Sequence, residues 1–219
     1  MKPFLFTNLG DRGLMLVVND VPYKLLKVCA GTFITNSDDK VQEVSIPCDF
    51  YMGETPITEE FYYAVMREES KNRSQKPLVN KKWGQFNEFI STLCGITHLP
   101  FRLPTESEWE YAAKGGHLSK GYKYSGSDEL TDVCYFHRNS NLAHELQNVK
   151  RFLPNEIGLY DMTGNIFELC SDILDGYHVS KGGAWYNLME DRFDPEITWL
   201  EKNIEEKGNR GIGIRLALS

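Results

Sequence analysis

The sequence lacks paired cysteines and long apolar runs, and each absence argues against a class of protein. The five cysteines are dispersed, and no Cys-x-x-Cys pair occurs among Cys29, Cys48, Cys94, Cys134 and Cys170. We therefore expect reduced, mostly buried thiols rather than a disulfide framework, which indicates the cytosol. No stretch of about 18 consecutive apolar residues occurs, so no membrane span is expected.

Positive charge is also scarce, because the formal net charge is −7. A broad nucleic-acid footprint is therefore not expected. Residues 1–10 contain no continuous apolar segment, so we expect no signal peptide and predict a cytoplasmic location. Apolar residues are abundant, at 41% of 219 residues with 12% aromatic. That composition suits one packed domain spanning residues 1–219.

Strand patterns occur near both ends of the sequence. Within residues 13–28, two apolar runs flank Asn19-Asp20, which predicts an amino-terminal hairpin that ends at residue 28. Further segments have the composition or alternation of strands: 31–33, 41–46, 181–185 and 211–218.

Three helices are expected between these strands. The first begins at the N-cap Thr58, and the second has apolar residues three and four apart over 83–95. The third begins with a capping box formed by Thr105 and Glu108. From residue 117 onward Gly, Tyr, Asn and Ser predominate, which predicts long ordered loops. The sequence therefore predicts an α+β domain with its helices early and loop-rich β structure later.

Four blocks carry a family resemblance. They are FRLPTESEWEYAAKGG (101–116), PNEIGLYDMTGNIFELCSD (154–172), KGGAW (181–185) and GIGIRLAL (211–218). In this order they resemble the formylglycine-generating enzyme, or sulfatase-modifying factor, family. The resemblance implies a C-type-lectin-like fold, with a small twisted antiparallel sheet, flanking helices and long ordered loops. The family core is then expected to span residues 29–219.

The resemblance also bears on catalysis. In the family's oxidase, two cysteines beyond the Arg-Gly-Gly-Ser-Trp block bind copper. Residues 186–210 contain no cysteine here, and every cysteine precedes Gly182. We therefore expect no copper, and we predict a non-catalytic binding protein, a pseudoenzyme of this family. The alternatives are a copper- or iron-dependent oxidoreductase acting on a thiol or peptide substrate, and a purely structural or accessory role.

The segment that replaces the copper site predicts a helix. Asp194 suits an N-cap, Pro195 the first helical position and Gly208 the position after the last turn. A helix over 195–207 would place three apolar residues on one stripe, namely Ile197, Leu200 and Ile204.

The same segment is acidic. Residues 187–209 contain seven acids and three basic residues, a net charge of −4. This composition fits either a solvated helix face or a surface that binds a basic protein or peptide. The residues expected to contact the partner are Tyr186, Asp191, Arg192 and Trp199.

A turn at 163–165 is the candidate metal loop. Asp161 precedes this turn and Glu168 follows it, and carboxylates with turn carbonyls are the ligands that calcium prefers. The family resemblance implies a structural Ca²⁺ bound by the side chains of Asp161 and Glu168 and by the carbonyls of Gly164 and Ile166. The alternative is that both acids only hydrogen-bond the turn.

Overall fold

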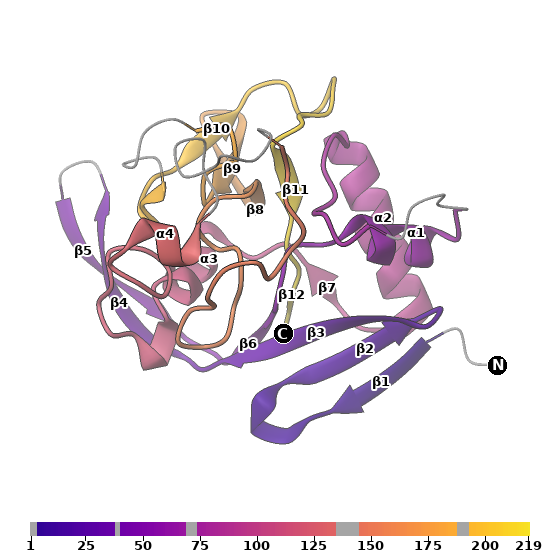
Figure 1. Ribbon diagram of the computed structural model, residues 1–219, viewed down its shortest axis with the longest axis horizontal. Helices are drawn as coiled ribbons and strands as arrows, with labels where there is room; N and C mark the ends of the chain where they lie inside the picture. The colour runs from indigo at the N-terminus through magenta and orange to yellow at the C-terminus, as the bar shows by residue number, and fades with distance from the viewer. Residues whose placement is uncertain (1–3, 38–39, 69–73, 135–144, 188–192) are drawn as a thin grey trace.

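The ranges 4–37, 40–68, 74–134, 145–187 and 193–219 are described in a computed structural model of the chain. Within these ranges the strands form three sheets, and the buried apolar side chains form two large clusters and one small cluster. The α-helices come from the middle of the sequence (Figure 1). None of the helices in these ranges has the length and apolar character of a membrane span.

The largest sheet is antiparallel and is built mainly from the amino-terminal half. Its strands, in spatial order, are β1 (Phe4–Asn8), β2 (Leu14–Val18), β3 (Val21–Val28), β6 (Phe50–Gly53), β12 (Ala217–Leu218) and β7 (Phe101–Arg102). β2 and β3 form the hairpin predicted around Asn19-Asp20. Both turn residues have positive φ, 46° and 67°, as a tight two-residue hairpin turn requires.

Two smaller sheets complete the β structure. One contains β10 (Trp199–Glu201), β9 (Tyr177–Lys181), β8 (Phe167–Leu174) and β11 (Ile212–Ile214), in that order. The other is the hairpin of β4 (Gly31–Ser37) and β5 (Lys40–Ile46). The prediction of a strand over 181–185 is wrong beyond Lys181, because Gly182 and Gly183 turn the chain with φ of 97° and 78°.

The helices follow their local signals. The elements are η1 (Gly10–Arg12), α1 (Glu59–Met66), α2 (Trp83–Thr97), α3 (Glu106–Ala113), η2 (Gly116–Leu118) and α4 (Leu130–Val133). Thr58 caps α1, and Thr105 with Glu108 forms the predicted capping box of α3. α2 passes Gly95 and ends where His98 adopts a left-handed conformation, whose N–H bonds the Cys94 carbonyl.

The carboxyl-terminal segment 211–218 lies in the core. All of its residues are buried, including Arg215. Its apolar side chains divide between a cluster around α1 and α2 and a second cluster around Trp109 of α3. The last strands therefore contribute side chains to both apolar clusters.

The predicted helix over 195–207 is wrong. Asp194 accepts a hydrogen bond from the Glu196 N–H, and the Ile197 N–H bonds the Asp194 carbonyl, so the capping signal produces one turn only. The chain then forms β10, whose residues pair with β9. The edge of β9 supplies backbone partners, and Ile197, Thr198 and Trp199 are types that favour strands.

The apolar stripe of that helix is separated accordingly. Ile204 is 3% exposed and belongs to the larger cluster, whereas Ile197 is 37% exposed. Leu200 is partly buried and packs against the cluster around Trp109. The three residues therefore lie in three different environments.

Ile204 and Ile197 provide a matched test of this correction. Ile204→Ala should lower the free energy of unfolding by about 2–5 kcal/mol, because it leaves a cavity in the core. Ile197→Ala should change it by about 0.5 kcal/mol or less, because the side chain is already partly in water. Urea denaturation measures both. If both variants lost the same free energy of unfolding, the two isoleucines would be equally buried, as in the predicted helix, and the observed fold would be contradicted.

Candidate functional site

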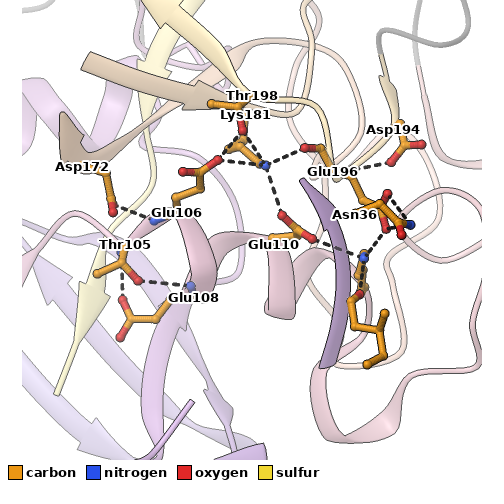
Figure 2. Close-up of polar contacts among 12 residues, drawn as sticks. Asn36, Thr105, Glu106, Glu108, Glu110, Asp172, Lys181, Asp194, Glu196 and Thr198 are labelled. Carbon is orange, nitrogen blue, oxygen red and sulfur yellow. Dashed lines mark hydrogen bonds and ion pairs between the residues drawn. The ribbon is translucent and has the colours of Figure 1, made fainter. Parts of the chain in front are cut away.

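A buried lysine, Lys181, connects helix α3 to the segment before β10. Lys181, the last residue of β9, has no exposed side-chain surface. Its Nζ lies 3.2 Å from Glu110 Oε2 and 3.4 Å from Glu106 Oε1, both on α3 (Figure 2). It also lies 3.2 Å from the Glu196 carbonyl and 3.3 Å from Thr198 Oγ1. One ammonium group thus links α3 to the segment that leads into β10.

The geometry of α3 explains why two acids reach this lysine. Glu106 and Glu110 are four residues apart and therefore lie on one face of the helix. Glu108 belongs to another face, where it pairs with Arg102 at 2.6 Å. From the sequence, all three acids are simply residues near a helix start. The partner of two of them could be identified only once β9 was placed beside α3.

Glu196 fixes the same segment from the outside. Its carboxylate accepts hydrogen bonds from Lys114 at 2.7 Å and from Asn36 of β4 at 3.0 Å (Figure 2). Burial opposes ionisation of Glu196, but these bonds outweigh burial and lower its pKa. The turn before β10 is therefore held by both α3 and the β4–β5 hairpin.

A pocket lies on the surface beyond β10. We call it the 201–210 pocket. It has a volume of about 550 Å³, and its polar lining includes Asn80, Lys202, Asn203, Lys207, Asn209 and Arg210. The Asn80 N–H bonds the Asn209 carbonyl at 3.0 Å, and the Trp83 N–H bonds the Ile204 carbonyl at 2.9 Å. The start of α2 therefore holds the loop that forms the pocket.

Glycine at position 208 is required by this arrangement. A Cβ added there would lie 2.4 Å from the Asn80 backbone, which is closer than packed atoms allow. The pocket wall is thus a close approach of two backbone segments.

Two of the predicted partner residues lie near this pocket. Tyr186 is 38% exposed, and its ring packs closely against Gly211, the residue after Arg210 in the pocket wall. Trp199 is half-buried, and its ring centroid lies 5.2 Å from that of Phe167. The Tyr186 ring lies 6.4 Å from the same phenylalanine. Tyr186 and Trp199 thus lie on one side of the molecule, whereas Asp191 and Arg192 fall outside the described residues.

Of the predicted calcium ligands, Glu168 has protein partners. Its Oε1 accepts from Arg215 Nη2 at 2.7 Å, and its Oε2 accepts from Arg215 Nε at 2.9 Å and from Trp109 Nε1 at 2.6 Å. Burial opposes the charge of Arg215, but the Glu168 carboxylate outweighs burial and raises the pKa of the guanidinium. Both carboxylate oxygens of Glu168 therefore already accept hydrogen bonds from protein donors.

The other predicted calcium ligands, Asp161, Gly164 and Ile166, lie in or beside the 163–165 turn. Asp161 accepts hydrogen bonds from the Lys150 N–H at 2.9 Å and from Asn165 Nδ2 at 3.4 Å. The Gly164 carbonyl accepts the Ile166 N–H at 2.8 Å. Within the described ranges no group of three His, Cys, Asp or Glu residues could hold a metal ion, but the predicted set contains only two acids with two carbonyls. Asp161 hydrogen-bonds the turn through Asn165, whereas Glu168 bonds Arg215 and Trp109 instead. Calcium binding stays a prediction.

Comparisons with known proteins agree on one family. Residues 19–219 match the family model described as "Sulfatase-modifying factor enzyme 1-like domain". The chain is 30% identical over 151 residues to the chaperone protein LppX of Paenibacillus barcinonensis, covering 58% of this chain and 51% of LppX. It is 35% identical over 118 residues to the formylglycine-generating enzyme of Streptomyces coelicolor, covering 48% of this chain and 35% of the enzyme. The chain thus spans about half or less of these relatives.

A solved structure confirms the fold. Treponema denticola variable protein 1 superimposes with a TM-score of 0.76 at 22% identity, and the match covers 98% of both chains. The predicted α+β, C-type-lectin-like fold of the sulfatase-modifying factors is therefore confirmed.

The buried lysine generates a stability prediction. Lys181→Met leaves Glu106 and Glu110 without their shared cation, so it should lower the free energy of unfolding by about 3–5 kcal/mol. Lys27→Met is the control, since the Lys27–Asp49 pair at 2.8 Å is partly exposed on both sides and should contribute about 1 kcal/mol or less. Urea denaturation measures both. Equal effects would mean that Lys181 is no stronger a link than a surface ion pair.

Asp161 generates a prediction about pH. Burial raises its pKa to about 6, so its contribution to stability is full below pH 4 and is lost as the pH rises through 6. Relative to Asp161→Asn, the wild type should lose up to about 3 kcal/mol between these pH values. Asparagine suits the left-handed φ of 56° at this position.

Calcium would reverse this trend. A bound cation favours the ionised carboxylate, so it should lower the pKa of Asp161 and stabilise only the wild type at neutral pH. Thermal unfolding of both proteins, with chelator and with calcium, makes the comparison. A calcium-induced shift that is absent or equal in both would contradict the predicted calcium site.

Proposed function

The chain belongs to the sulfatase-modifying factor enzyme 1-like family, and within it we propose a non-catalytic binding protein. In this proposal the chain recognises a protein or peptide through the surface around Tyr186, Trp199 and the 201–210 pocket.

The observation that carries the proposal is the absence of cysteine from residues 186–210. The family's oxidase places its two copper ligands in that part of the chain, and thiolates are the ligands that Cu(I) prefers. The expectation of mostly buried thiols is wrong, because Cys29 and Cys94 are partly exposed and Cys48 is exposed. Cys134 and Cys170 are buried, and burial raises the pKa of these two thiols well above the ordinary value. Thiols in such surroundings are poor nucleophiles and poor metal ligands.

The rigidity of the surface supports a binding role. Lys181 and Glu196 hold the segment before β10, and the start of α2 holds the pocket loop. A surface that is ordered before binding loses less conformational entropy when a partner arrives. Aromatic residues with partial exposure, such as Tyr186, are frequent anchors of interfaces.

The names of the similar proteins point to different functions. One is named an enzyme, one a chaperone protein and one a variable protein. Because the match covers only 35% of the Streptomyces enzyme, its activity is not carried over to this chain. Function must instead be tested at the surface of this chain itself.

The test for the enzyme alternative is direct. Purified protein is loaded with Cu(I) or Fe(II) and dialysed, and then metal content and oxygen consumption on a cysteine-containing peptide are measured. The proposal expects no stoichiometric metal and no oxygen consumption above that of free metal. Turnover that depends on the protein would overturn the proposal in favour of a thiol oxidoreductase.

A second experiment tests the surface. Wild type, Tyr186→Ala and Leu5→Ala are used as baits, and the captured proteins are quantified by mass spectrometry. Leu5 is 61% exposed on β1, a strand that lies on the opposite side of the molecule from β10 (Figure 1). A partner should bind wild type and Leu5→Ala equally and Tyr186→Ala at least tenfold more weakly, a loss of about 1.4 kcal/mol. Equal capture by all three folded baits would contradict the proposed surface.

A further inference from the structure

The acidic residues of the proposed surface are largely engaged within the protein. Glu196 is paired with Lys114 and Asn36. Glu205 Oε1 lies within hydrogen-bond distance of His178 Nε2, at 2.8 Å, and Glu201 accepts a hydrogen bond from the Ser180 hydroxyl at 2.9 Å. Lys114 therefore offsets the charge of Glu196, while the carboxylates of Glu201 and Glu205 are held against β9 by hydrogen bonds.

The basic residues at the 201–210 pocket are arranged differently. Lys207 and Arg210 are exposed and, within the described ranges, have no ion-pair partner. Lys202 lies 5.4 Å from the Tyr177 ring centroid, a contact that leaves its charge uncompensated. Three cations thus border one concavity, whose single acid is Glu201.

Glu201 does not offset these cations fully. Burial opposes its ionisation and raises its pKa, although the hydrogen bond from Ser180 acts in the other direction. Its carboxylate is also held by β9 through that bond. Among the residues that line the pocket, three cations therefore face one acid.

The pocket also offers neutral hydrogen-bonding groups in fixed positions. Asn80 and Asn209 are joined through their backbones, and Gly208 packs against Asn80. An arginine fork binds a carboxylate or a phosphate through two parallel hydrogen bonds, and a lysine supplies a compact charge beside it.

From this geometry we infer that the 201–210 pocket receives an acidic side chain of a peptide partner, either a carboxylate or a phosphorylated residue. This inference rests on the proposed function and gives the partner's chemistry. It differs from the basic partner suggested by the acid count, because most of the counted acids in the described ranges have internal partners. Lys207 and Arg210 are the residues that contact the anionic group.

The experiment uses three labelled peptides and two double variants. Hexaglutamate and a triphosphoserine peptide represent the two acidic sources, and hexalysine represents the basic alternative. Lys207→Gln/Arg210→Gln removes the pocket cations. Arg12→Gln/Lys27→Gln removes the same charge near β1 and β3, and fluorescence anisotropy at low ionic strength measures the dissociation constants.

Wild type and Arg12→Gln/Lys27→Gln should bind at least one acidic peptide, and Lys207→Gln/Arg210→Gln should bind it at least tenfold more weakly. The peptide that binds tighter identifies the carboxylate or the phosphate. No acidic-peptide binding, equal loss in both double variants, or preferential hexalysine binding would each overturn the inference.

The same variants separate this inference from the proposed function. A captured partner that needs Tyr186 but is indifferent to Lys207→Gln/Arg210→Gln would leave the binding surface intact and refute the anionic contact. Acidic-peptide binding at the pocket, with no partner that depends on Tyr186, would instead refute the part of the proposed surface that Tyr186 forms and keep the anionic contact.

Discussion

The burial of Lys181 is the constraint on which the arrangement of the candidate site depends. A buried ammonium group is stable only when carboxylates and other acceptors replace the water that it has lost. Glu106 and Glu110 supply the negative charge from α3, while Thr198 and the Glu196 carbonyl complete the contacts. Satisfying this one charge fixes the chain before β10, and β10 can then pair with β9.

A second buried ion pair performs a similar role for the carboxyl-terminal strands. Arg215 bonds Glu168 of β8 and also donates to the carbonyls of Gly53 and Tyr160. These bonds connect β8, β6 and the loop before the 163–165 turn through one side chain. The half of the molecule with the least regular structure is therefore held by compensated charges as well as by apolar packing. Such pairs specify an arrangement even where they add little net stability.

The sequence predicts features that depend on neighbouring residues and fails where distant residues decide. Asn19-Asp20, Thr58 and Thr105 were sufficient for a hairpin and two helix starts, because turn and cap bonds span only a few positions. Asp194-Pro195 is an equally local signal, but it fits a single turn as well as a helix. The β9 edge decided between them. The family blocks led to the fold, but could not show which acids were already paired, since Glu168 meets its partner 47 positions away.

The central claim is that Lys181 holds the segment before β10 in place and so orders the binding surface. Backbone amide hydrogen exchange of wild type and Lys181→Met, followed by mass spectrometry, tests it most directly. We expect protection of residues 199–201 in the wild type, and its loss in Lys181→Met while β2 and β3 stay protected. Unprotected β10 amides in the wild type, or protection that survives removal of the lysine, would contradict the account.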